Sequence, residues 1–444
     1  MTERLTIVGG GLAGCEAAWR AAAHGLKATL VEMRPGKTTP AHQTGYLAEL
    51  VCSNSLRSDN PKNAVGLLKE ELRALGSIVM RAADRFKVPA GGALAVDRVL
   101  FAEEITRLIE EHPLIEVARE EFKPPISAEK PLIIAAGPLA TGALAEELSK
   151  ICGEANLHFY DAIAPVVAAD SLNLEKLFKA NRHEEEEGGD YLNAPFEKGE
   201  FELFASALLE ADQSEPRPFE DKRHFEGCLP IEVMAERGIR TLAFGPMRPV
   251  GLINPATGKK PYAVAQLRQE NLQADHYNLV GFQTRLTRSA QEKVLRLIPG
   301  LERAEFARYG SIHRNTFLSA PQALDQFSRL KRAPGVFAAG QISGVEGYVE
   351  SAAHGLWAGE NAARRLKGLP MASPPRETAL GSLMWHLRGE NLGKGGFSPS
   401  NITFGLFPPQ EESVPKSQRA AKRLEAARSA LPPFLAAIGY PPAP

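Results

Sequence analysis

The hydrophobic pattern at the start of the chain predicts a strand, a helix and a second strand in close succession. Residues 5–8 form a short, mainly apolar run that indicates a buried strand, and the helix that follows it ends at His24 and Gly25. Residues 27–31 form the second strand. A further apolar run at residues 132–137 ends in small residues, which is typical of a strand buried on both faces of a parallel sheet. We expect it to lie beside the first strand.

Two scaffold helices are predicted after this unit, separated from it by a polar loop over residues 34–60. The first runs over residues 61–75, with Asn60 as its N-cap and Gly76 at its end. The second runs over residues 97–111 and stops before Pro113. Its apolar face repeats with helical period and comprises Val99, Ala102, Ile105, Leu108 and Ile109.

The βαβ pattern is interrupted in the middle of the chain and then returns. From about residue 165 to 305 short mixed segments follow one another without a βαβ rhythm. A strand at residues 335–340 then leads into a glycine-rich turn and a helix over residues 348–366. The sequence therefore predicts one discontinuous α/β domain, residues 1–164 and 306–444, with a smaller α+β domain inserted at residues 165–305.

The turn between the first strand and helix carries the spacing of a dinucleotide-binding fingerprint, Gly9-Gly10-Gly11-Leu12-Ala13-Gly14. In that motif Gly9 makes the tight turn, Gly11 lets a pyrophosphate approach the backbone and Gly14 lets the helix pack on its strand. Phosphate oxygens then lie at the positive end of the helix. Glu32, which follows the second strand, is placed to accept hydrogen bonds from ribose hydroxyls. This favours FAD or NAD over a 2′-phosphorylated cofactor.

The late glycine-rich turn favours FAD over NAD, because its backbone amides can reach a second portion of a large cofactor. No second fingerprint is visible, so a dedicated NAD(P)H domain is not expected. The fold class is thus α/β, a glutathione-reductase-like FAD-binding Rossmann domain with the inserted α+β domain. The residues expected to contact the cofactor are Gly9, Gly11, Leu12, Ala13, Gly14, Glu32, Gly137, Gly340, Gln341, Gly347, Tyr348 and Ala352.

Composition agrees with an ordinary globular protein of two domains, at 444 residues with 44% hydrophobic and 24% charged residues. No apolar run has the length of a membrane span, and a strand that begins at Leu5 leaves no room for a signal peptide, so we expect a cytoplasmic protein without membrane contact. The formal net charge of -1 gives no overall attraction to nucleic acid. Any such binding must come from local basic clusters.

The four cysteines show no CxxC spacing, and no metal site is expected. Cys15 and Cys152 lie in predicted helices and are assigned to packing. Cys52 lies in the polar loop close to Arg57, an environment that lowers a thiol pKa, and Cys228 lies between a glycine and a proline-ended apolar stretch. The residues alone leave Cys52 and Cys228 open between a buried packing role and chemistry.

Several uncommon strings are similar to those of the TrmFO family, the folate- and FAD-dependent tRNA uracil-5-methyltransferases, and the resemblance runs over essentially the whole chain. Besides the fingerprint, the strings are Cys52-Ser53-Asn54-Ser55-Leu56-Arg57, Phe225-Glu226-Gly227-Cys228-Leu229-Pro230, Gly281-Phe282-Gln283-Thr284, the segment 340–355, and Phe404-Gly405-Leu406-Phe407-Pro408.

The resemblance implies transfer of a one-carbon unit from methylenetetrahydrofolate to carbon 5 of a T-loop uridine in tRNA, giving ribothymidine, with reduced FAD as reductant and NAD(P)H recharging it. It implies that Cys228 adds to carbon 6 of the uracil and that Cys52 acts as a base or a second thiol. A thiolate suits that addition, and the proton on carbon 5 needs a base within hydrogen-bond reach. Which cysteine performs which step stays open. The partners implied are tRNA and folate, without an obligate protein partner.

Contacts with tRNA are predicted at two basic clusters, since a target base must leave its stack beside positive charge. The clusters are Arg285 with Arg288, and one face of a C-terminal helix with Lys416, Arg419, Lys422 and Arg423.

Three other functions remain in competition. One is a GidA or MnmG type of wobble-uridine modification, although too few residues follow the helix ending at Leu366 for that family's C-terminal extension. The second is a small-molecule flavin oxidoreductase. The third is a non-catalytic FAD-bound tRNA-binding protein, which should survive loss of Cys228.

Overall fold

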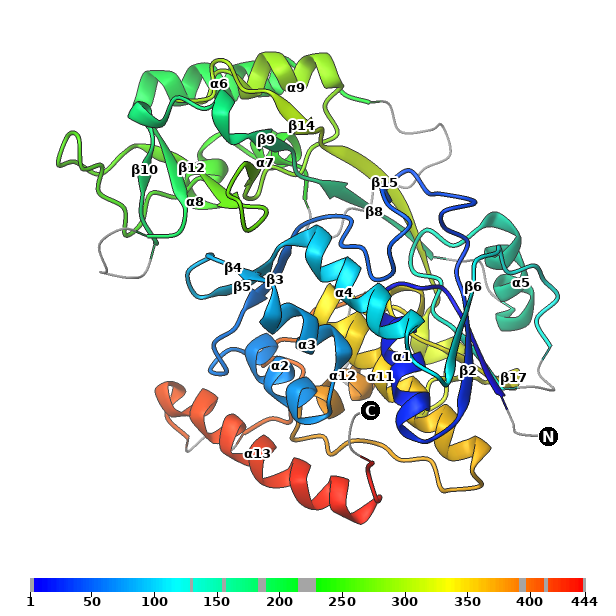
Figure 1. Cartoon of the computed structure of the whole chain (residues 1–444). Helices are drawn as coiled ribbons and strands as arrows, with labels where there is room; N and C mark the ends of the chain where they lie inside the picture. Colours follow the sequence, from blue (N-terminus) through cyan, green and yellow to red (C-terminus); the bar gives the residue numbers. More distant parts are fainter. Residues whose placement is uncertain are drawn as a thin grey trace.

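The computed structural model of the chain describes residues 4–127, 131–153, 157–182, 189–214, 229–390, 397–410 and 414–441. It contains two large sheets, each with its own hydrophobic core. Figure 1 shows the two sheets in separate lobes of the molecule: the blue, yellow and orange parts of the chain surround one sheet, and the green part surrounds the other.

The first sheet is the parallel sheet of a Rossmann-type fold. Its strands in spatial order are β16 (Arg329–Leu330), β17 (Ala333–Ala338), β7 (Leu132–Ile134), β1 (Arg4–Val8), β2 (Lys27–Val31) and β6 (Ile115–Ala118). All neighbours run parallel except β16 and β17. Val8 of β1 lies opposite Ile134 of β7, so the predicted pairing of these strands is confirmed. The chain leaves β1 toward β2 on one side and returns to β7 on the other, which makes this edge a topological switch point.

Two long helices cross on this sheet, α1 (Leu12–Ala23) and α11 (Tyr348–Leu366). Their backbones approach closely because α11 carries glycines at the crossing. A Cβ at Gly355 would lie 2.2 Å from the carbonyl oxygen of Ala13, and one at Gly359 would lie 2.7 Å from the Cα of Ala17. This contact fixes the start of α11 beside the fingerprint turn. The bounds of α11 are those predicted for this helix.

The remaining elements of this part form a helical layer and a small antiparallel sheet. The sheet has the order β3 (Ser55–Ser58), β5 (Ala93–Val96), β4 (Lys87–Val88). The helices are α2 (Ala64–Ala74), α3 (Ile78–Arg85), α4 (Arg98–Glu110), α5 (Gly142–Cys152), α12 (Ala379–Leu387) and α13 (Arg419–Ala437). In Figure 1, α13 is the red helix at the edge of the molecule.

The second sheet is antiparallel throughout. Its strands in spatial order are β10 (Phe178–Lys179), β11 (Leu192–Phe196), β12 (Ala263–Gln269), β13 (His276–Leu279), β9 (Val166–Ala168) and β14 (Phe306–Arg308). Its core contains an aromatic group of Phe196, Phe201, Phe204 and Phe282. The helices near it are α6 (Lys198–Glu210), α7 (Ile231–Glu236), α8 (Arg240–Phe244) and α9 (Arg288–Leu295).

The two parts are joined by a pair of antiparallel strands, β8 (Leu157–Ile163) and β15 (Ser311–Phe317). A short helix, α10 (Ala320–Ala323), follows β15 and leads back to the first sheet. Figure 1 shows the two strands running side by side between the parts.

Several sequence predictions need correction in detail. The helix expected from residue 61 begins at Ala64, because the Asn60 side chain instead accepts a hydrogen bond from the Lys62 N–H (2.9 Å) and forms a turn. Val99 belongs to no core face, since it is 50% exposed. The predicted loop over residues 34–60 ends in the strand β3. Lys416 lies in a short 3₁₀ turn, Lys416–Gln418, that precedes α13.

No helix in the described ranges combines the length and apolar character that a bilayer crossing requires.

Candidate functional site

A pocket opens where the parallel strands of the first sheet end. Its wall is formed by the residues that follow β1, β2, β7 and β17, at the switch point of the strand order. The empty space measures about 1060 Å³, with its open mouth included. Ligands of open α/β sheets bind at this edge.

The fingerprint glycines occupy two different environments. Gly14 is packed, because a Cβ there would lie 1.8 Å from the carbonyl oxygen of Gly9. Gly9 adopts a φ of +103° and makes the turn. By contrast, a Cβ at Gly11 or at Gly137 would meet no protein atom within 4 Å. The space beside Gly11, at the positive end of α1, is therefore a cradle for an anionic group.

Glu32 lines the same pocket, and its carboxylate is held by hydrogen bonds from Gly10 and Arg34. It is 6% exposed; Oε2 accepts a hydrogen bond from the Gly10 N–H (2.7 Å), and Oε1 accepts from the N–H and the Nε of Arg34 (3.0 and 2.9 Å). Burial raises the pKa of this carboxyl, but the hydrogen bonds from Arg34 and Gly10 outweigh it, and the net shift is downward. Oε2 keeps an acceptor site for a ligand hydroxyl.

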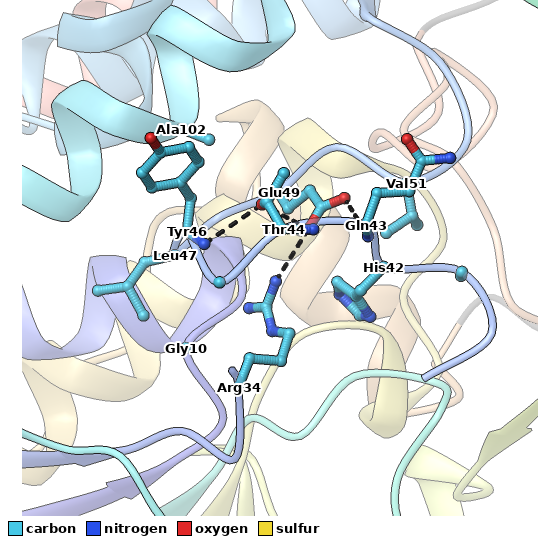
Figure 2. Close-up of polar contacts among 12 residues, drawn as sticks. Gly10, Arg34, His42, Gln43, Thr44, Tyr46, Leu47, Glu49, Val51 and Ala102 are labelled. Atoms are coloured by element: carbon cyan, nitrogen blue, oxygen red, sulfur yellow. Dashed lines mark hydrogen bonds and ion pairs between the residues drawn. The ribbon is translucent and has the colours of Figure 1, made fainter. Parts of the chain in front are cut away.

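A loop with a second carboxylate closes one side of the pocket. Glu49 accepts hydrogen bonds from the Gln43 N–H (2.8 Å) and from the N–H and hydroxyl of Thr44 (3.1 and 2.9 Å), and it pairs with Nη1 of Arg34 (3.2 Å). Figure 2 shows these groups converging on Glu49. His42 lines the pocket in the same loop, and burial, with the charge of Arg34, lowers its pKa to about 4. The loop therefore presents a neutral imidazole.

The predicted cofactor residues divide into those that line the pocket and those that support it. The lining residues are Gly9, Gly11, Leu12, Ala13, Glu32, Gly137, Gly340, Gln341 and Tyr348. Gly14, Gly347 and Ala352 are absent from the wall; Gly14 packs against the turn and Ala352 is fully buried in α11. Three further lining residues, Arg34, His42 and Glu49, were not predicted from the sequence. Their polar loop was visible in the sequence, but its fold over the pocket was not.

The loop that carries Cys52 is held beside this pocket by Tyr348. The Tyr348 hydroxyl oxygen accepts hydrogen bonds from the N–H of Cys52 (2.6 Å) and of Ser53 (3.2 Å). Tyr348 and Val51 both line the pocket. Burial, and then the charge of Cys52, raise the pKa of Tyr348, so its hydroxyl stays neutral. One side chain thus connects the predicted cofactor wall to the predicted reactive thiol.

Two arginines bind the backbone of the Cys52 loop, and one of them, Arg98, is also paired with Glu270. Arg98 donates to the carbonyl of Leu50 (2.6 Å), and Arg308 donates to the carbonyl of Val51 (2.6 Å). Both arginines interact electrostatically with Cys52.

The same loop is also tied to the second sheet. Arg268 of β12 donates to the side chains of Asn54 (2.9 Å) and Ser53 (2.8 Å). The Asn54 amide in turn donates to the carbonyls of Gln269 (3.0 Å) and Glu270 (3.3 Å). Arg268 and Asn54 are both buried, so these bonds are shielded from water. The Cys52 loop therefore lies at the junction of the two parts.

Tyr348→Phe should loosen this loop. Two N–H groups lose their acceptor, and each buried unsatisfied donor costs on the order of 1 to 3 kcal/mol. We expect Cys52 to be alkylated several-fold faster in this variant than in the wild-type protein, with the reaction monitored by mass spectrometry. Tyr440→Phe is the matched control, because Tyr440 donates to the Leu75 carbonyl (3.0 Å) away from the loop. Equal alkylation rates in the two variants would show that Tyr348 does not restrain Cys52.

Cys228 lies outside the described residues. The chain is described again from Leu229, and the N–H of Ile231 donates to the carbonyl of Gln283 (2.8 Å). The segment that follows Cys228 is therefore paired with the Gly281-Phe282-Gln283-Thr284 string.

The predicted basic clusters differ in how much of their charge is available. Arg285 lies within 3.6 Å of Glu232 and 3.4 Å of Glu236, so its charge is compensated. Arg288 is exposed and lies over the ring of Tyr309. On α13, Arg423 lies over the ring of Phe404, while Lys422 is exposed. Within the described part of the chain, no three His, Cys, Asp or Glu side chains gather as metal ligands.

Fold and pocket together define an α/β dinucleotide-binding protein of the GidA type. The family described as "Glucose inhibited division protein A" matches residues 4–370. Two solved structures of Aquifex aeolicus GidA superpose with TM-scores of 0.72 and 0.70 at 16% and 17% identity, covering 99% and 98% of this chain and 74% and 76% of theirs. At that identity the likeness concerns the fold.

Relatives of higher sequence identity show to which subfamily the chain belongs. Proteins named methylenetetrahydrofolate–tRNA-(uracil-5-)-methyltransferase TrmFO are 54% identical in Geobacter sulfurreducens, covering 99% of this chain and 100% of the relative, and 55% identical in Geotalea uraniireducens, covering 97% and 98%. The chain belongs to the TrmFO family. The resemblance found in the sequence is thereby confirmed, and so is the α/β FAD-binding Rossmann-type fold.

Proposed function

We propose that this protein transfers a one-carbon unit from methylenetetrahydrofolate to carbon 5 of a T-loop uridine in tRNA, with bound FAD and with NAD(P)H as the source of electrons. The observation that carries the proposal is the double role of Tyr348, which lines the fingerprint pocket and holds the loop of Cys52. The reaction class is that in the names of relatives 54% identical over nearly the whole chain.

The pocket fits FAD by its own geometry. The open space beside Gly11 and Gly137 accepts a pyrophosphate at the start of α1, and Glu32 keeps an acceptor for a ribose hydroxyl. Gly340, Gln341 and Tyr348 would hold the remainder at the start of α11. When bound, FAD supplies the two electrons that turn a transferred methylene into a methyl group.

The two cysteines would prepare the uracil. Carbon 5 becomes nucleophilic when a thiolate adds at carbon 6, and we propose Cys228 for this addition. After the carbon unit is attached, the proton on carbon 5 has to leave. Cys52, whose loop carbonyls accept hydrogen bonds from Arg98 and Arg308, is the proposed base or second thiol.

The domain division supports such an arrangement. We infer that residues 1–164 and 306–444 form the FAD-binding domain and that residues 165–305 form an inserted domain that meets tRNA. The strands of the antiparallel sheet, which run from Val166 to Arg308, support this division. Among the basic residues predicted from the sequence, Arg288 and Lys422 keep exposed charges and are proposed as peripheral tRNA contacts. A tRNA substrate also supports a cytoplasmic location.

A comparison of labelled donors tests the function. Purified protein, FAD and NAD(P)H are incubated with a tRNA transcript that carries uridine in its T loop. Label from methylenetetrahydrofolate should enter the transcript as ribothymidine, whereas label from S-adenosylmethionine should not. Incorporation from S-adenosylmethionine, or no incorporation from either donor, would contradict the proposal.

A further inference from the structure

One stretch of the inserted part is rich in cations and contains no acid. Between Arg237 and Gln269 the chain has six Lys or Arg residues and no Asp or Glu. For a protein with a formal net charge of -1 this is a strong local imbalance. The stretch follows Cys228 in the chain and includes α8 and the loops up to β12.

The cations of this stretch keep their charge available. Five of the six are exposed, and four of these five take part in no ion pair among the described residues: Arg240, Arg248, Lys259 and Lys260. Burial, and then the neighbouring charge of Arg248, lower the pKa of Arg182 to about 10, so a further cation reinforces the same positive face. Arg285 differs, because Glu232 and Glu236 compensate it.

Large apolar side chains are interspersed with these cations. Phe244, the last residue of α8, is 81% exposed, Ile253 is 57% exposed and Val250 is 50% exposed. Tyr262 is 36% exposed. We call these four residues, with Arg240, Arg248, Lys259 and Lys260, the 240–262 surface. Proteins bind RNA by combining two kinds of side chain: cations that bind the phosphates, and aromatic rings that stack on the bases.

Pro246 connects this surface to neighbouring segments on two sides. On one side Pro246 lies against Gly281, whose string pairs with the residues after Cys228. On the other side Arg182 donates to the Pro246 carbonyl (2.7 Å).

Asn181, which precedes Arg182, accepts a hydrogen bond from the Asp190 N–H (2.9 Å), and Asp190 and Tyr191 contact the hairpin of β4 and β5. Asp190 accepts from the Gly91 N–H (2.5 Å), and Tyr191 donates to the Ala90 carbonyl (3.2 Å). This hairpin pairs with β3, which begins three residues after Cys52. Figure 1 shows α8 on the same side of the molecule as β4 and β5.

We propose that the 240–262 surface binds the tRNA substrate, with its four cations on backbone phosphates and Phe244 stacked on an unpaired base. The inference rests on the proposed function and names the surface that meets its macromolecular substrate. Charge complementarity selects RNA, since an acid-free stretch of chain with four available cations matches a polyanion.

The salt dependence of binding to an unmodified tRNA transcript tests whether the cations of the 240–262 surface contact phosphates. Lys259→Ala/Lys260→Ala should weaken binding on the order of tenfold, and should lower the magnitude of the slope of log K against log salt by about 1.4 to 1.8. Lys27→Ala/Lys150→Ala removes the same charge from exposed positions on β2 and α5 and should leave the slope unchanged. Equal slopes in both double variants would overturn the proposal.

Steady-state kinetics tests the proposed stacking of Phe244 on a base. Phe244→Ala should raise KM for tRNA on the order of tenfold, with flavin content, melting temperature and KM for the folate donor unchanged. An unchanged KM for tRNA, or a dimer in light scattering that Phe244→Ala dissociates without altering tRNA affinity, would assign the surface to another role. Label transfer by the wild-type protein separates the two hypotheses. If the wild-type protein transfers label while the variants bind tRNA normally, only the assignment of the 240–262 surface fails. If the wild-type protein transfers no label, the proposed function fails.

Discussion

Gly11→Ala is expected to give a stable, colourless protein that binds FAD at least about a hundredfold more weakly, a change of ~2.8 kcal/mol in binding free energy. The added methyl group meets no protein atom within 4 Å, and Gly11 has a φ of -77° that alanine accepts, so the fold has no reason to change. The methyl group instead occupies the space where the pyrophosphate would approach the backbone. Flavin absorbance after reconstitution and the melting temperature of the apoprotein measure the two effects separately.

Gly199→Ala is the matched control. Gly199 lies in α6, also has no atom within 4 Å of an added Cβ, and lies far along the chain from the pocket. It should bind FAD as the wild-type protein does, with a small gain in stability from the lower entropy of the unfolded chain. If Gly11→Ala retained wild-type FAD affinity, the cradle beside Gly11 could not be the pyrophosphate site.

Cys228→Ala is expected to lower methyl transfer by roughly 10³-fold or more while FAD stays bound, because a nucleophile that forms a covalent bond to carbon 6 has no substitute. Cys52→Ala should also lower turnover strongly, through loss of the base or second thiol. The amount of ribothymidine formed in a single turnover measures methyl transfer in each variant, and the flavin content of the same sample shows whether FAD stays bound.

Cys152→Ala provides the control for these substitutions. Cys152 ends α5, in a part of the chain that carries no proposed step. Its substitution should leave turnover unchanged. Wild-type turnover in Cys228→Ala would remove the thiol addition from the mechanism and favour a binding role for the protein.

The parallel sheet was predictable because its signals are local. The run at residues 132–137 is apolar on both faces and indeed pairs with β1. The helix over residues 348–366 was predicted with its observed bounds, since glycines precede it and its apolar period continues to its end. The predicted start of α2 was wrong, because the Asn60 side chain forms a turn with the Lys62 N–H and the helix begins at Ala64. Such a choice depends on packing rather than on residue type.

The surroundings of Cys52 could not be predicted from its loop. Asn54 and Arg268 meet only after the two parts of the chain have folded, and the same holds for Arg308 and the carbonyl of Val51. The acid-free stretch was present in the sequence, but pairing decides which charges are available. Arg285 resembled a tRNA contact until its neighbours Glu232 and Glu236 were placed.

The most direct test of the account is a single turnover without added NAD(P)H. Holoprotein with its flavin reduced beforehand is mixed with labelled methylenetetrahydrofolate and a tRNA transcript that carries uridine in its T loop. The account predicts that labelled ribothymidine forms in an amount equal to the flavin oxidised, and that none forms with Cys228→Ala. Label transfer that leaves the flavin reduced, or flavin oxidation under anaerobic conditions without ribothymidine, would contradict it.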